Sequence, residues 1–161
     1  MNDTQELARI GATAPRRVIG VGAMALLGGL LLYLAVAEPP QAMFWQVFLI
    51  ALGGFALWFA MRMWEATGHT LILTEDALTD SDGTLVARLD NIEKVDRSTF
   101  AMKPSNGFLI LLGTPDGAAW RPGLWWRMGR RIAIGGVTSG AVTKPVADVI
   151  AALLVQQGDE D

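Results

Sequence analysis

The stretch Val18–Met61 decides the fold: it reads VIGVGAMALLGGLLLYLAVA, then EPPQA, then MFWQVFLIALGGFALWFAM. Neither apolar run, Val18–Ala37 or Met43–Met61, contains a charged side chain. At about 1.5 Å per residue, a helix of about 20 residues spans about 30 Å, the thickness of the hydrocarbon layer of a membrane. Pro39 and Pro40 prevent the first helix from continuing into the second. The sequence therefore predicts a transmembrane helical hairpin over residues 18–63, with spans at about 18–37 and 43–63.

The charges that flank the hairpin predict its orientation. Arg9, Arg16 and Arg17 lie in the N-terminal arm, residues 1–17, whereas the segment between the two runs has no Lys or Arg. Positive residues favour the cytoplasmic side, so we expect both termini to be cytoplasmic. Residues of the types that anchor a helix at the membrane interface stand near the ends of the second run: Trp45, Trp58, Trp64 and Arg62.

A cleavable signal peptide is the alternative interpretation of the first run. Arg16-Arg17 precede it, and Ala35-Val36-Ala37 at its end matches an A-x-A cleavage site, so cleavage would remove residues 1–37. The run is longer than an ordinary signal sequence and a second span follows almost at once, which favours the uncleaved hairpin.

Small residues within the two runs predict close helix packing. Ala25 and Gly29 form one small-xxx-small pair, and Ala56 and Ala60 form another. These faces can pack on each other or dock onto another membrane subunit. Neither apolar run, Val18–Ala37 or Met43–Met61, contains Asp, Glu, Lys, Arg or His, which argues against a proton relay or an ion pathway.

From His69 onward the pattern changes to short β-type segments and turns, followed by one amphipathic helix. Val146, Val149, Ile150, Leu153 and Leu154 follow helical spacing, with Thr143 as the expected cap and Gly158 as the expected end before an acidic tail, residues 158–161. The predicted strands are Thr70–Thr74, Ala77–Asp80, Leu85–Leu89, Ile92–Thr99, Phe108–Leu112, Ala118–Arg121 and Arg131–Val137, with turns at Asp82-Gly83 and Asp116-Gly117. About seven strands and a closing helix predict an α+β protein whose residues 69–157 form a small antiparallel barrel or roll.

The order of these segments resembles a known family. Five segments are similar to the bacterial pleckstrin-homology-like domains. They are LTEDAL, RLDNIEKV, GFLILL, the Gly135-Gly136 strand end and the terminal helix VADVIAALL. The resemblance covers roughly Thr70–Leu154. It implies a cytoplasmic domain that follows transmembrane helices in the inner membrane of a bacterium.

The most unusual segment of this domain lies at residues 120–131, where three Trp and four Arg occur within twelve residues of an otherwise acidic region. Indole rings favour lipid headgroups, and arginines bind phosphates. We therefore predict a loop that contacts the membrane or a membrane partner. The competing interpretation places Trp120 and one of Trp125 or Trp126 in the core, with the arginines paired to acidic residues. The predicted contact residues are Trp120, Arg121, Trp125, Trp126, Arg127, Arg130 and Arg131.

Catalytic, metal and cofactor motifs are not apparent in the sequence. It has no cysteine, and its net charge of −3 gives no reason to expect a nucleic-acid partner. Asp80–Gly83 resembles the start of a calcium loop, but Leu89 stands where the ligating Glu belongs, so a tight turn is expected. His69 has no evident partner for a metal site or a catalytic dyad.

These observations predict a non-enzymatic protein. We expect an accessory or assembly subunit of a larger bacterial membrane complex, docked through its hairpin and its Trp- and Arg-rich loop. The alternative is an autonomous membrane-anchored module that senses lipids, with anionic headgroups as ligands, or acts as a scaffold.

Overall fold

The computed structural model describes residues 5–98 and 104–160, the last four of these by their backbone alone. The chain divides into two compact units. One unit is a helical pair, residues 14–65, and the other combines the chain up to Thr13 with the chain from Ala66 onward. The helical pair is therefore an insertion within the second unit.

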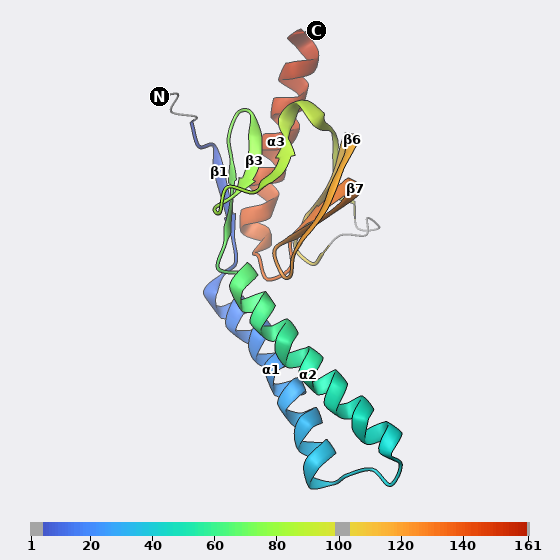
Figure 1. Cartoon of the computed structure of the whole chain (residues 1–161). Helices are drawn as coiled ribbons and strands as arrows, with labels where there is room; N and C mark the ends of the chain where they lie inside the picture. The colour runs from blue at the N-terminus through green and yellow to red at the C-terminus, as the bar shows by residue number, and fades with distance from the viewer. Residues whose placement is uncertain (1–4, 99–103, 161) are drawn as a thin grey trace. The chain divides into compact units, whose positions relative to one another are not determined.

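The inserted unit consists of α1 (Ala14–Ala37) and α2 (Met43–Ala66), which Figure 1 shows side by side and joined by a short loop. Both helices are long and apolar enough to cross a membrane, as predicted. They approach closely at two glycines: a Cβ atom built on Gly28 would lie 2.9 Å from the carbonyl oxygen of Gly53. A side chain at either position would push the helices apart.

The second unit contains two antiparallel sheets. The first sheet has four strands, in the order β1 (Ala8–Gly11), β2 (Thr70–Leu73), β3 (Ala77–Asp80) and β4 (Leu85–Arg88). The second has three strands, in the order β5 (Ile92–Asp96), β6 (Phe108–Arg121) and β7 (Trp125–Ile134). Of the predicted barrel or roll, a closed barrel does not form among the described residues, because the 3₁₀ turn η1 (Leu89–Asn91) separates β4 from β5 and these strands belong to different sheets.

Strand β1 is the element that the sequence analysis did not anticipate. The segment treated as an N-terminal arm pairs with β2 across four residues, from Ala8 opposite Leu73 to Gly11 opposite Thr70. In Figure 1 the blue strand β1 lies beside the green strands, although the whole of α1 and α2 separates them in sequence. Ile10 is 1% exposed and lies in the core, so this strand contributes both backbone hydrogen bonds and apolar packing.

Strands β6 and β7 form a hairpin that is longer than predicted. The predicted turn at Asp116-Gly117 is wrong, because β6 continues through it and the chain reverses between Arg121 and Trp125. The register between the strands shifts on both sides of Asp116, which identifies a bulge rather than a turn. Gly123, with φ of +82°, provides the left-handed backbone of the true turn.

The C-terminal helix α3 (Gly140–Glu160) contacts β1, β5 and β6 and so packs against both sheets. It begins before the predicted cap: the backbone N–H of Ala141 donates to the hydroxyl of Ser139, and Thr143 lies inside the helix. It also continues through Gly158, since a glycine near a helix end costs only about 1 kcal/mol. Thr99 and Asp161, which end a predicted strand and the predicted tail, lie outside the described residues.

One core joins the two sheets and α3. Its largest buried side chains come from every layer, and α3 contributes Val146, Ala147 and Ile150. The core members include Ile10, Leu71, Leu73, Leu78, Val86, Leu89, Phe108, Ile110, Leu112, Leu124, Trp125, Ile132 and Ile134.

Candidate functional site

Residues 120–131 form the far end of the β6–β7 hairpin, here called the Trp/Arg hairpin. Trp120 pairs directly with Trp126 across the two strands, and Arg121 pairs with Trp125. Side chains alternate between the faces of a strand, so Trp125 and Trp126 point in opposite directions. The segment predicted to be a loop is therefore a two-stranded ribbon whose faces differ.

The inner face of the Trp/Arg hairpin carries Trp125, which is 2% exposed and belongs to the core. Its predicted contact with a membrane or a partner is wrong, because a side chain that is almost fully buried has no surface to offer. The competing interpretation, which placed Trp120 and one of Trp125 or Trp126 in the core, is confirmed for Trp125 and is wrong for Trp120, which is 53% exposed.

The outer face carries an exposed apolar patch, defined by Trp120, Trp126 and Met128. Trp120 is 53% exposed and Met128 is 68% exposed, while Trp126 is half-buried. These three residues line a shallow depression of about 560 Å³ together with Ala118, Ala119 and Arg127. Met128 was missed in the sequence analysis, and its position two residues after Trp126 on a strand is the signal that places it on the same face.

The arginines of this hairpin bind groups of the domain itself. Arg121 forms ion pairs with Asp80 and Asp82. Arg127 forms an ion pair with Asp116 at 2.8 Å, and its guanidinium donates hydrogen bonds to the carbonyls of Gly117, Leu85 and Val86.

Arg130 pairs with Glu93 at 2.7 Å and donates to the carbonyl of Leu112, whereas Arg131 is exposed. Three of the four arginines are thus neutralised by nearby carboxylates. For these three, the competing interpretation that the arginines pair with acidic residues is confirmed. The pairing leaves the outer face more apolar than cationic.

A buried carboxylate, Asp80, lies beneath this hairpin. Its side chain is fully buried, and it contacts His69 Nδ1 at 3.3 Å, Arg121 Nε at 3.4 Å and the indole N–H of Trp125 at 3.4 Å. Asp80 is thus a neighbour of His69 that the sequence analysis did not identify. The pairing of Asp80 with Leu71, two residues after His69, brings the imidazole and the carboxylate together.

Ser81 also lies beside this histidine, which raises the question of a catalytic triad. The Ser81 hydroxyl is 3.4 Å from His69 Nδ1, the same nitrogen that faces Asp80. A triad requires the carboxylate on one ring nitrogen and the nucleophile on the other. These three residues therefore form a structural hydrogen-bond group and do not have the geometry of a hydrolase.

His69, Asp80 and Asp82 lie close enough to hold a metal ion, since one ligand atom from each lies within 4.8 Å of the others. Arg121 binds both carboxylates and already supplies a positive charge there. Hydrogen bonds from the hydroxyl and the backbone N–H of Thr84, helped by Arg121, lower the pKa of Asp82 and keep it ionised. Asp80–Gly83 forms the expected tight turn, with the Gly83 N–H donating to the Asp80 carbonyl.

Asp80→Asn is expected to lower the free energy of unfolding by about 2–3 kcal/mol, because it leaves Arg121 without its buried partner. Asp82→Asn is the matched control, and because Asp82 is partly exposed we expect a loss of about 1 kcal/mol or less. Urea unfolding of the detergent-solubilised protein, followed by tryptophan fluorescence, measures both changes. Equal losses for the two variants would contradict the structural role of Asp80.

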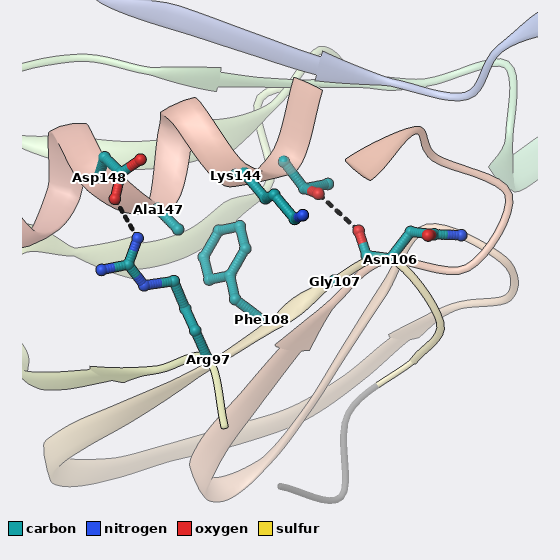
Figure 2. A pocket seen from close by; sticks show the side chains of 8 residues that line it. Arg97, Asn106, Gly107, Phe108, Lys144, Ala147 and Asp148 are labelled. Carbon is teal, nitrogen blue, oxygen red and sulfur yellow. Dashed lines mark hydrogen bonds and ion pairs between the residues drawn. The ribbon is translucent and has the colours of Figure 1, made fainter. Parts of the chain in front are cut away.

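A second cavity, of about 300 Å³, lies where β5, β6 and α3 meet, and Figure 2 shows its lining. Arg97 reaches across to Asp148 on α3, and the Thr143 hydroxyl donates to the carbonyl of Asn106. Phe108 points between these pairs. These two contacts link α3 to the segment after β5 and to the segment before β6.

The predicted packing residues of the helical pair separate into two groups. Ala56 and Ala60 are buried and Ala25 is half-buried, whereas Gly29 is exposed with no neighbour within 4 Å of a Cβ atom built on it. Gly29 therefore takes no part in the contact between α1 and α2, because Gly28 occupies the face that meets α2.

The predicted interface anchors all lie on exposed parts of α2. Trp45 makes edge-to-face contacts with Phe44 and Phe48, and Trp58 packs beside Phe55. Arg62 pairs with Glu65, and the ring of Trp64 lies beneath the guanidinium of Arg17, 3.9 Å from the ring centroid.

No known protein family, curated protein or solved structure matches this chain. The resemblance to pleckstrin-homology-like domains stays a prediction.

Proposed function

We propose that this protein is a non-enzymatic accessory or assembly subunit of a larger bacterial membrane complex. In this proposal α1 and α2 cross the inner membrane and both termini are cytoplasmic. The apolar patch of the Trp/Arg hairpin then docks onto a partner membrane protein. The observation that carries the proposal is the apolar patch of Trp120, Trp126 and Met128 on a ribbon in which three of the four arginines pair with carboxylates of the domain.

The pairing of the arginines favours a protein partner over anionic lipid. An arginine that meets an anionic membrane surface contributes about 1 kcal/mol, but only when its charge is available to the headgroups. Arg121, Arg127 and Arg130 each bind a carboxylate of the domain. What remains around Trp120 and Met128 is an apolar surface, which matches the centre of a protein interface, where tryptophan and methionine are enriched and charges are depleted.

The strand pairing supports the proposed orientation. β1 and β2 flank the helical pair in sequence and pair with each other over four residues. Both strands must therefore lie on one side of any membrane that α1 and α2 cross. Arg16, Arg17 and Arg62 stand near these strands in sequence, and the positive-inside rule assigns that side to the cytoplasm.

Site-specific photocrosslinking in a bacterium that encodes this protein tests the proposed interface. A photoreactive phenylalanine at position 120 or 128 is expected to crosslink one membrane protein, whereas the same residue at Lys94, an exposed position on β5, is expected to crosslink little. The double variant Trp120→Ser/Met128→Ser should reduce co-purification of the crosslinked protein at least tenfold, because hot-spot residues of this type contribute about 2 kcal/mol or more. Crosslinks to lipid alone at positions 120 and 128 would favour the lipid-sensing alternative instead.

A further inference from the structure

The buried carboxylate of Asp80 has different neighbours at its two oxygen atoms. Its Oδ2 atom lies 3.4 Å from Arg121 Nε and 3.4 Å from the indole nitrogen of Trp125, both on the Trp/Arg hairpin. Its Oδ1 atom lies 3.3 Å from His69 Nδ1 and 3.3 Å from the hydroxyl oxygen of Ser81. Arg121 therefore contacts one oxygen of this carboxylate, and the other oxygen faces His69 and Ser81.

His69 Nδ1, Asp80 Oδ1 and Ser81 Oγ form a nearly equilateral triangle. Ser81 Oγ lies 3.4 Å from His69 Nδ1, and the other two sides are each 3.3 Å. Hydrogen bonds between such groups are usually shorter, at about 2.7–3.0 Å. Ligands of a tetrahedral zinc ion lie about 3.3–3.5 Å apart, because zinc binds nitrogen and oxygen at about 2.0–2.2 Å. The triangle therefore has the spacing of three ligands around one ion.

The charge of this group also suits a cation. Asp80 and Asp82 provide two carboxylates, and the guanidinium of Arg121 contacts the Oδ2 atom of each. One guanidinium balances only one of the two negative charges, so the group stays negative when His69 is neutral. Asp82 also offers a ligand atom within 4.8 Å of those of His69 and Asp80, which places a fourth donor beside the triangle.

We propose that His69, Asp80 and Ser81, with Asp82 beside them, bind one divalent transition-metal ion, for which zinc is the best fit. An imidazole combined with carboxylates suits zinc, whereas magnesium and calcium prefer ligand sets made of oxygen alone. The side chain of His69 is 31% exposed, so an ion can enter from solvent. The bound ion joins the residue before β2 to the turn between β3 and β4. This inference depends neither on membrane insertion nor on the docking patch.

Calorimetric titration of the full-length protein in a non-ionic detergent with zinc chloride tests the proposal. The protein carries no histidine tag and is first treated with EDTA and returned to metal-free buffer. We expect one zinc ion per chain and much weaker binding of magnesium. His69 is the only histidine and the sequence has no cysteine, so His69→Gln should lower the zinc affinity at least about tenfold. No binding by the wild type at about 1 mM zinc, equal binding of magnesium, or wild-type affinity in His69→Gln would each overturn the proposal.

Two matched variants separate this site from general surface charge. Asp82→Asn and Glu75→Gln each remove one negative charge, but Glu75 is an exposed residue between β2 and β3. We expect Asp82→Asn to lower the zinc affinity about tenfold and Glu75→Gln to change it by less than about twofold. Circular dichroism checks that each variant keeps its secondary structure. Equal effects of the two variants would show that zinc responds only to net charge and would refute the site.

Nitrogen NMR of the single histidine identifies the ligand atom without any substitution. The proposal places zinc on Nδ1, the ring nitrogen that faces Asp80 and Ser81. Zinc should therefore shift the resonance of Nδ1 to the range of a metal-bound nitrogen and change that of Nε2 much less, because the two ring nitrogens are chemically distinct. Zinc bound to Nε2, or bound to the protein with neither resonance shifted, would contradict the proposed site.

Discussion

A fragment that begins at Ala66 is expected not to fold stably, whereas the same fragment joined to residues 5–13 by a short Gly/Ser linker is expected to fold. The reason is β1, which provides a row of hydrogen bonds to β2 and fills the core with Ile10. Loss of one buried isoleucine side chain costs about 2–5 kcal/mol, and a small domain has only about 5–15 kcal/mol of stability.

The linker can be short because Gly11 lies opposite Thr70, so the ends of β1 and β2 are neighbours. About four residues bridge antiparallel strands in this arrangement. Circular dichroism and urea unfolding of the two fragments measure the difference. Ile10→Asp in the linked fragment is the control and should abolish the stability that residues 5–13 add. A cooperative unfolding transition in the unlinked fragment, unchanged by added peptide 5–13, would contradict the role of β1.

Trp125→Ala is expected to destabilise the protein by about 3–5 kcal/mol, whereas Trp120→Ala should change the free energy of unfolding by about 0.5 kcal/mol or less. The two residues belong to adjacent pairs of the same hairpin, since Trp120 pairs with Trp126 and Trp125 pairs with Arg121. Trp125, however, lies in the core, and its indole N–H donates to Asp80. Trp120 is largely exposed. Removing the Trp125 side chain leaves a cavity in the core, and Asp80 loses the hydrogen bond from the indole N–H.

Urea unfolding of the full-length protein in detergent, with circular dichroism as the signal, compares the two tryptophan variants. Crosslinking from position 128 measures contact with the partner. Trp120→Ala should weaken this contact although it leaves the fold intact. A similar loss of stability in both variants would show that Trp120 is also a core residue.

The sequence could predict the elements whose signal is local. Two long runs without a charge are sufficient to identify α1 and α2, because membrane-length apolar helices need no tertiary information. Alternation between apolar and polar residues located β2–β5 in the same way, and helical spacing located most of α3. These features depend on neighbours within a few residues.

Features that depend on distant pairing could not be predicted. β1 has four residues and one core side chain, Ile10, so its sequence shows no recognisable alternation of apolar and polar residues. Its partner strand, β2, follows both helices in the sequence. The faces of Trp125 and Trp126 depend on where the hairpin turns, and a shift of one residue exchanges them. Asp116-Gly117 has the composition of a turn, but Arg127 binds Asp116 and the Gly117 carbonyl within a bulge instead. The group around His69 and Asp80 likewise depends on strand register.

The insertion of α1 and α2 between two paired strands also has a consequence for biogenesis. β1 leaves the ribosome before either helix, and β2 leaves it only after both. For a hairpin that crosses the membrane, the first sheet can be completed only when both helices have inserted and the chain has returned to its starting side. A chain in which one helix fails to insert keeps an unpaired edge on β2 and an empty place for Ile10, and both defects expose it to proteolysis. For a hairpin that crosses the membrane, completion of the sheet therefore depends on correct insertion of both helices.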